Sequence, residues 1–330
     1  MKQRLSFFLP IIFLLLLCVC CFFSIFYGVK STNLTIITDI ITQKNTNSFY
    51  YDVVLARISR TIFGVLAGAA LGIAGTLMQI ITKNPIADPS ILGVNSGASF
   101  FVLCGISFLH IQNKNHFIWL AFLGGLCAAI FVFFIAGSSK MTPVKLALSG
   151  AATSTFLYSM TNIILFLNLQ TMEMFRFWQI GSIGGASFSD IKTMLPYLLL
   201  GFLISFLLLP YIHILMLGDE HAITLGVPVV FIRTSIILAS VLLCSATTAL
   251  AGPIGFIGLI VPHVVKKFCG ANIYKLLPLS GILGACVLLF ADTLGRILGR
   301  PSEMETGIIT ALIGGPIFIL TICKQKGREQ

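Results

Sequence analysis

Long apolar runs separated by short polar connections make up most of this chain of 330 residues. Each run holds roughly 18 to 25 residues, which is enough to cross about 30 Å of hydrocarbon as a helix and is too long for a barrel strand. The runs predict ten spans, over residues 7–28, 58–81, 91–109, 117–137, 143–168, 194–216, 229–250, 254–268, 276–298 and 306–323. The pattern therefore predicts an all-α integral membrane protein with about ten transmembrane helices in a single transmembrane domain, residues 1–330.

Composition and missing motifs exclude several classes of protein. Only 10% of the residues are charged and the mean hydropathy is +1.01, whereas about a quarter of a soluble domain is charged. The chain has no phosphate-binding loop of the G-x-x-x-x-G-K-[ST] type, and eight of its nine cysteines lie in or beside apolar spans, as buried small hydrophobic residues do. Its basic residues are scattered between spans and form no aromatic-interleaved patch. We therefore expect no catalytic activity, no metal site, no cofactor and no nucleic-acid partner.

The basic residues also bear on topology. Ten spans place both termini on one side, and the positive-inside rule favours the cytoplasm by twelve basic residues to nine. The margin is narrow because Arg57, Arg60, Arg296 and Arg300 crowd the outer ends of spans. Either the orientation is reversed, or these arginines meet an acidic partner outside. With the termini inside, residues 29–56 form an external loop.

Small residues follow one face of the second span. Gly64, Gly68, Gly72 and Gly75 are spaced by four, four and three residues, so they share one side of a helix. Such a face allows another helix backbone to approach closely.

Ionisable residues within the spans are almost limited to Asp292. Asp292 and Arg296 are spaced i, i+4, so they can pair on one helix face near the outer end of a span. Ion-coupled transporters usually carry several intramembrane carboxylates as a relay. Their scarcity here argues that a partner protein supplies the energy, although a secondary transporter remains an alternative.

One polar segment stands out between two apolar runs, the sequence LGDEHAITLGVP at residues 217–228. Asp219 and Glu220 suit the first turn of a helix, where the macrodipole favours acids, and Gly226 followed by Pro228 suits its end. The segment is either a plain interhelical loop or a short helix that docks a cytoplasmic motor.

Several long motifs in order resemble the FecCD-type permeases of bacterial ABC importers, which carry iron–siderophore, haem and vitamin B12 substrates. They are NPIADPSILGVNSGA at 84–98, FWQIGS at 177–182, LGDEHAITLGV at 217–227, GPIGFIGLIVPH at 252–263 and LPLSGILGACVLLFADTLGR at 277–296. The resemblance covers about Arg57 to Phe318. It departs at Ser59, where the family commonly has Pro, and at Glu305-Thr306, which replaces a Pro-aliphatic pair.

The resemblance implies a type II ABC importer permease fold, in a multi-pass protein of the bacterial cytoplasmic membrane with both termini cytoplasmic. It implies three kinds of protein partner: two cytoplasmic ATP-binding-cassette ATPases, an extracytoplasmic substrate-binding protein, and a second permease subunit in a homo- or heterodimer. The implied ATPase-coupling residues, within the segment 217–228, are Gly218, Asp219, Glu220, His221, Ala222, Leu225 and Gly226. The implied docking residues for the binding protein are Arg57, Arg60 and Arg296, and Thr142 and Pro143 lie where the family narrows on the cytoplasmic side.

The expected function is that of a permease subunit of an ATP-driven importer, moving ferric siderophore across the cytoplasmic membrane. Haem or cobalamin is the alternative cargo for the same kind of importer. A secondary transporter that works without an ATPase is the more distant alternative.

Overall fold

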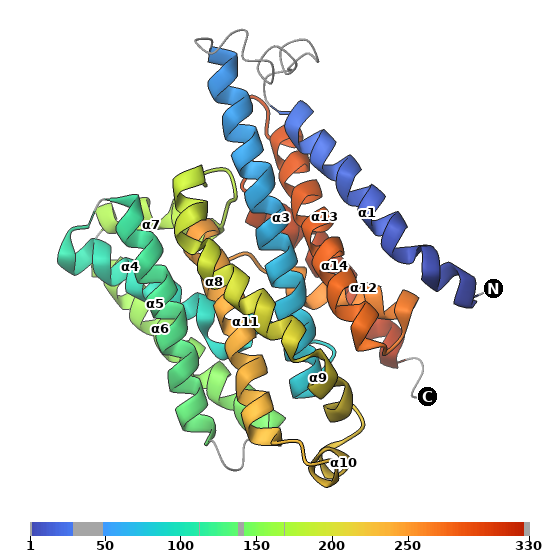
Figure 1. The fold of residues 1–330 in the computed structure, drawn as a ribbon. Helices are drawn as coiled ribbons and strands as arrows, with labels where there is room; N and C mark the ends of the chain where they lie inside the picture. Colours follow the sequence, from blue (N-terminus) through green and yellow to red (C-terminus); the bar gives the residue numbers. More distant parts are fainter. Residues whose placement is uncertain (1, 29–48, 112, 138–141, 168, 327–330) are drawn as a thin grey trace.

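The computed structural model describes residues 2–28, 49–111, 113–137, 142–167 and 169–326, which are almost entirely helical (Figure 1). The helices are α1 (Lys2–Phe26), α3 (Phe49–Thr82), the 3-10 helix η1 (Pro89–Leu92), α4 (Val94–Leu109), α5 (Lys114–Ala136), α6 (Pro143–Leu167), α7 (Leu169–Ile180), α8 (Phe188–Leu207), α9 (Leu209–Leu215), α10 (Asp219–Thr224), α11 (Val229–Ala251), α12 (Ile257–Cys269), α13 (Ile273–Leu298) and α14 (Thr306–Lys326).

Every predicted span coincides with helix in the structure. Among the described residues, seven helices are long and apolar enough to cross a membrane, and α4 and α14 add two shorter apolar helices. The remaining predicted span, at residues 254–268, corresponds to the shorter helix α12. The all-α membrane architecture is thus confirmed, and the count of about ten spans agrees with it.

The predicted external loop at residues 29–56 is wrong at its C-terminal end. Residues 29–48 lie outside the described residues, but residues 49–56 form the first turns of α3. Val54 is fully buried there against Ile25, Phe26 and Ile58. Residues 49–56 read FYYDVVLA, so their apolar character belongs with the helix that follows and not with the polar stretch before them.

Helices α3 and α13 form the central pair of the bundle and lie side by side along most of their lengths (Figure 1). A Cβ atom on Gly68 would lie 2.4 Å from the carbonyl oxygen of Gly284, and one on Gly72 would lie 2.3 Å from that of Ser280. Real Cβ atoms do not approach oxygen so closely. The glycine face of the second span therefore lets two backbones touch, as the spacing predicts.

Helix α12 continues through Pro262. Proline has no N–H to donate, so the carbonyl group of Gly258, four residues earlier, loses its helical partner. The side-chain amide of Gln79 in α3 donates to this oxygen at 3.4 Å and to the neighbouring carbonyl oxygen of Leu259 at 3.1 Å. A neighbouring helix thus satisfies the exposed backbone, which an apolar surrounding requires.

The close backbone contact between α3 and α13 can be tested directly. Gly68→Ala should lower the free energy of unfolding by about 1–3 kcal/mol, because the new methyl group meets backbone that cannot yield. Gly315→Ala in α14 is the matched control, since no atom lies within 4 Å of its Cβ position. The measurement is thermal unfolding of the purified chain in detergent, and equal midpoints for the two variants would contradict the packing argument.

Candidate functional site

The polar segment at 217–228 forms the short helix α10, which projects from one end of the bundle between α9 and α11 (Figure 1). Gly218 precedes the helix with φ 118° and ψ 155°, a backbone conformation that residues with a Cβ rarely adopt. Gly226 follows the helix with φ 75°, in the left-handed region. The two glycines turn the chain sharply at both sides of α10, so the segment is a helix and not a plain loop.

The two faces of α10 differ in exposure. Ala222 is fully buried against the bundle, whereas Ile223 and Leu225 are 64% and 63% exposed. Leu217, just before the helix, is similarly exposed, and so are Glu220 and His221. Three large apolar side chains at one exposed tip favour contact with another protein. The sequence singled out Leu225 but missed Leu217 and Ile223, although apolar residues within a polar segment were a readable signal.

Asp219 ties α10 to two other elements. One guanidinium nitrogen of Arg233 in α11, Nη2, donates to both carboxylate oxygens of Asp219, at 2.7 and 2.8 Å. Lys83, at the end of α3, places its Nζ 3.7 Å from the same carboxylate. Asp219 therefore faces its own chain, and the exposed Glu220 is the acid that can meet a partner. Neither Arg233 nor Lys83 was predicted as part of this site, because both lie on other elements.

Thr142 and Pro143 lie at the beginning of α6. The hydroxyl oxygen of Thr142 accepts a hydrogen bond from the backbone N–H of Lys145 at 3.3 Å. Pro143 is the first helical residue, a position where its missing N–H costs nothing. The observed contacts are those of a helix start, and the gating role stays a prediction. Helix α6 begins at the end of the bundle that carries α10 (Figure 1).

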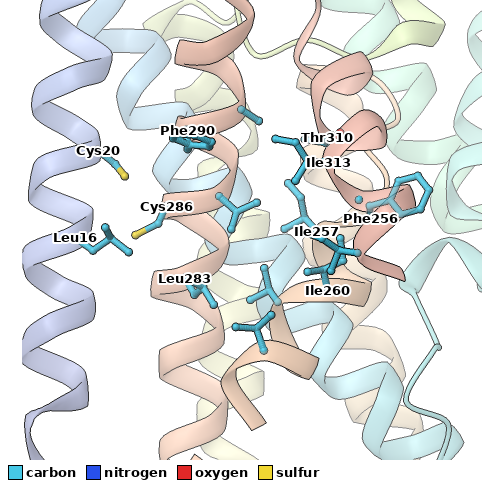
Figure 2. A pocket seen from close by; sticks show the side chains of 16 residues that line it. Leu16, Cys20, Phe256, Ile257, Ile260, Leu283, Cys286, Phe290, Thr310 and Ile313 are labelled. Carbon is cyan, nitrogen blue, oxygen red and sulfur yellow. The ribbon is translucent and has the colours of Figure 1, made fainter. Parts of the chain in front are cut away.

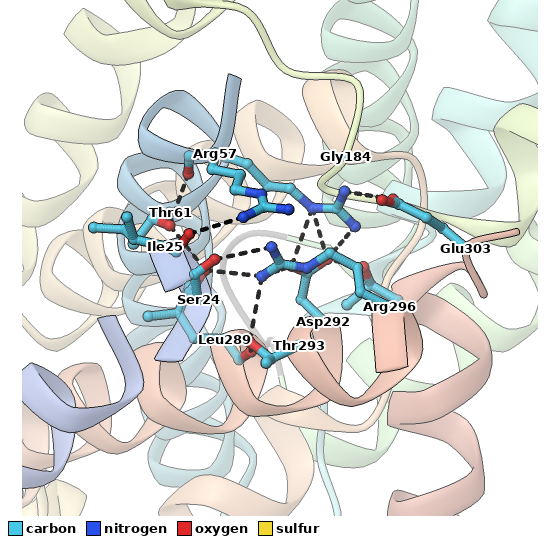
Figure 3. A network of polar contacts seen from close by, with 12 residues as sticks. Ser24, Ile25, Arg57, Thr61, Gly184, Leu289, Asp292, Thr293, Arg296 and Glu303 are labelled. Carbon is cyan, nitrogen blue, oxygen red and sulfur yellow. Dashed lines mark hydrogen bonds and ion pairs between the residues drawn. The ribbon is translucent and has the colours of Figure 1, made fainter. Parts of the chain in front are cut away.

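A buried charged network occupies the other end of the bundle (Figure 3). Asp292 of α13 has no exposed surface, and its carboxylate accepts from Arg60 of α3 at 2.7 Å and pairs with Arg296 at 3.0 Å. The hydroxyl of Thr306, the first residue of α14, donates to the same carboxylate at 3.0 Å. Arg60 also reaches Glu303, with 2.6 Å between Nη1 and Oε2. The predicted pair of Asp292 and Arg296 is confirmed.

The outer arginines also cap the C-terminal end of α1. Arg57 donates to the carbonyl oxygen of Ile25 at 3.3 Å, Arg296 to that of Ser24 at 2.9 Å, and Arg300 to that of Gly28 at 2.7 Å. The last carbonyl groups of a helix lack intrahelical partners and carry partial negative charge, so cations stabilise them. These intramolecular contacts account for basic residues at the ends of spans that are expected on the outer side, where the positive-inside rule disfavours them.

The three arginines expected to dock a binding protein lie beneath the surface. Arg57 and Arg60 are buried, and Arg296 is only 1% exposed. They line a cavity of about 320 Å³ that also borders Gly184 and Glu303. Their docking role stays a prediction, and the structure adds that a partner group would have to enter this cavity to reach them.

Ser59 lies next to this cavity and departs from the family pattern. Its hydroxyl donates to the carbonyl oxygen of Ala186 at 2.8 Å, and the side chain is buried. The bond fixes the connection between α7 and α8 against α3. A proline at this position could not make it.

A second cavity, of about 290 Å³, lies among α1, α12, α13 and α14 (Figure 2). It is lined by apolar side chains, the hydroxyl-bearing Thr310 and the thiols of Cys20 and Cys286, with no charged group. Such a lining offers nothing to hold a charged ligand, so this cavity is not a candidate site for one.

Comparisons with known proteins agree with these features. The FecCD transport family model matches residues 15–324. The Fe(3+)-citrate import system permease protein YfmD of Bacillus subtilis (strain 168) is 43% identical over 83% of this chain and 81% of its own length. The ferric enterobactin transport system permease protein FepD of Escherichia coli (strain K12) is 35% identical, over 94% of this chain and 93% of its own. A solved metal-chelate type ABC transporter in an inward-facing conformation superposes with a TM-score of 0.83 at 26% identity, covering 98% of this chain and 100% of that chain.

The charged network predicts a large loss of stability on neutralising its centre. Asp292→Asn should destabilise the chain by about 3–5 kcal/mol, because Arg296 would keep a buried charge without a counter-ion and Arg60 would keep only the partly exposed Glu303. Glu303→Gln, at the exposed edge of the network, should cost under about 1 kcal/mol. Thermal unfolding in detergent measures both changes. If Asp292→Asn were as stable as Glu303→Gln, the network would not be a structural centre.

Proposed function

The chain belongs to the FecCD transport family, and from this membership we propose that it is the permease subunit of an ATP-driven importer for a ferric siderophore. Members of this family are transport components of the cytoplasmic membrane and are not enzymes, so ATP hydrolysis falls to a separate chain. The alternative cargoes, haem and cobalamin, would use the same kind of importer. Identification of the ligand of the accompanying binding protein would separate the three.

The observation that carries the proposal is the tip of α10. Leu217, Ile223 and Leu225 expose apolar surface at the end of the bundle, with Glu220 and His221 beside them. Exposed apolar side chains with a polar rim are the usual composition of a protein interface. We assign this surface to the cytoplasmic ATPase, together with Gly218 and Gly226, which set the direction of the helix. Both termini then lie on the cytoplasmic side.

The internal contacts of α10 support a role in force transmission. The ion pair of Asp219 with Arg233 joins α10 to α11, and the contact with Lys83 joins it to α3. Helix α3 in turn touches α13 through backbone at Gly68 and Gly72. A displacement of α10 by closing ATPases would pass through these rigid contacts to the far end of the bundle. Such a motion would open the translocation path alternately to the two sides of the membrane.

The surface of α6 supports a second permease subunit. Only 17% of the residues in the best apolar window of α6 are buried, as for α1, but the mean hydropathy of that window is 1.3 compared with 2.9 for α1. An exposed and strongly apolar helix such as α1 suits lipid. Helix α6 instead exposes Thr155, Ser159 and Asn162 along one side. The Asn162 amide has no hydrogen bond within the described part of the chain, and a bare amide in lipid is costly.

This exposed side of α6 therefore faces either another protein or a water-filled path. Two permease subunits that surround a central, water-filled translocation path, each with α6 turned toward it, would provide both surroundings. The paired state of Asp292 further weakens the secondary-transporter alternative. Its carboxylate already binds two arginines and a threonine hydroxyl, so it is not available as a proton or sodium relay.

The tip of α10 can be tested by photo-crosslinking in intact cells. A benzoylphenylalanine at Ile223, which is exposed, should capture a P-loop ATPase that mass spectrometry identifies. Phe108 is a matched exposed apolar position near the end of α4, at the opposite end of the bundle (Figure 1), and should capture no ATPase. Ala222 is unsuitable for the probe because it is buried. A properly inserted Ile223 variant that captured no ATPase would revive the secondary transporter.

The exposed side of α6 can be tested with the same chemistry. Benzoylphenylalanine at Tyr158, an exposed aromatic residue of α6, should capture a permease chain, either a second copy or a related subunit. Phe22 is the matched aromatic position on α1 and should capture no permease chain, because that helix faces lipid. Equal capture of permease from both positions would contradict the assignment of α6 to the subunit interface or path.

A further inference from the structure

Glu303 lies just before α14, between two cavities. On one side it lines the cavity of about 320 Å³ with Arg57, Arg60 and Arg296. On the other side it lines a cavity of about 310 Å³ that also borders Ser182. Its side chain is 44% exposed, whereas the other acid of the network, Asp292, has no exposed surface. Glu303 is thus the acid of the network that reaches both a buried arginine and the surrounding water.

The arginine-lined cavity carries excess positive charge. Three guanidinium groups border it, and Asp292 and Glu303 are the two acids that pair with them among the described residues. The Nε atom of Arg296 is buried and has no hydrogen-bond acceptor among the described residues. A buried donor without an acceptor is unfavourable, so this site favours an additional anionic oxygen.

Glu303 already occupies part of this cavity. Its Oε2 accepts from Nη1 of Arg60 at 2.6 Å, while the Arg60 Nε and Nη2 atoms donate to Asp292. Glu303 is therefore the acid that holds Nη1, while Asp292 holds the other two nitrogens of the Arg60 guanidinium. An acid from outside that approached Nη1 in the same geometry would compete with Glu303.

We propose that Glu303 is an internal competitor for the binding-protein site: it holds Arg60 in the undocked permease, and a carboxylate of the docked partner displaces it. This inference rests on the proposed function, in which an extracytoplasmic binding protein docks at this end. The displaced side chain turns into the neighbouring cavity, where the Ser182 hydroxyl is a hydrogen-bond donor.

The displacement has a structural consequence beyond the cavity. Glu303 lies three residues before Thr306, whose hydroxyl donates to Asp292 and fixes the start of α14. Moving Glu303 shifts the connection that enters α14 while Asp292 keeps α3 and α13 together. Docking would in this way alter one helix of the bundle and leave the central pair in place.

The test compares two neutralised acids. Glu303→Gln removes the competitor, so docking of the binding protein should tighten by about threefold to fivefold, the upper part of the range expected for one partly exposed ion pair. Glu305→Gln removes the same charge two residues away. Glu305 lines only the neighbouring cavity of the two, and its side chain makes no hydrogen bond or ion pair in the described part of the chain. Docking to Glu305→Gln should stay within about twofold of wild type.

The experiment uses the assembled importer in lipid nanodiscs and the purified binding protein encoded beside it. Biolayer interferometry gives the Kd and the dissociation rate, and thermal unfolding verifies that each variant is folded. Glu303→Asp supplies a second variant, because its shorter side chain keeps the charge but no longer spans the distance to Arg60. It should also tighten docking.

The outcomes separate this inference from the proposed function. Unchanged or weaker docking of both Glu303 variants would overturn the competitor role while leaving the importer intact. Equal tightening by Glu303→Gln and Glu305→Gln would also overturn it, because the gain would then reflect surface charge alone. If the wild-type importer bound no such protein, the docking assignment itself would fail, and the competitor role with it.

Discussion

The carboxylate of Asp292 is the constraint on which one end of the bundle, opposite to α10, depends. It is fully buried and holds Arg60 of α3, Arg296 of its own helix and Thr306 of α14. A buried charge persists only when its partners satisfy it, so these three elements must meet at one point. Through Arg296 the same point reaches the last turn of α1.

The central pair of helices connects this end of the bundle to the other. At Gly68 and Gly72, backbone meets backbone, and no side chain separates α3 from α13 there. Such an interface transmits displacement well, because close-packed backbone has little room to yield. At the far end, Asp219 joins the short helix α10 to α11 and α3. The bundle therefore has a group of ion pairs at each end, and a rigid backbone contact between α3 and α13 connects the two ends.

The two ends of the bundle differ in the surface that they offer to a partner, and the difference suits their proposed roles. At the α10 end the carboxylate turns inward, and the exposed tip is apolar, which suits durable contact with another protein. At the opposite end the arginines lie below the surface in a cavity, with Glu303 at its exposed edge. Contact there requires an exchange of ionic partners, which suits a protein that docks and leaves. The more apolar contact and the more ionic contact thus lie on opposite sides of the bundle.

The sequence by itself determined the spans and the pair of Asp292 with Arg296, because each depends on local spacing or on the thickness of a bilayer. It left residues 217–228 as either a loop or a short helix, and the structure decided for the helix. It also carried the long motifs that indicate the family. Only the tertiary structure decided that Asp292 meets Arg60, a residue 232 positions away, and that Ala222 is buried while Ile223 is exposed. The tertiary structure likewise placed the arginines against the end of α1. These contacts depend on how helices pack against one another, and no periodicity along a single segment contains that information.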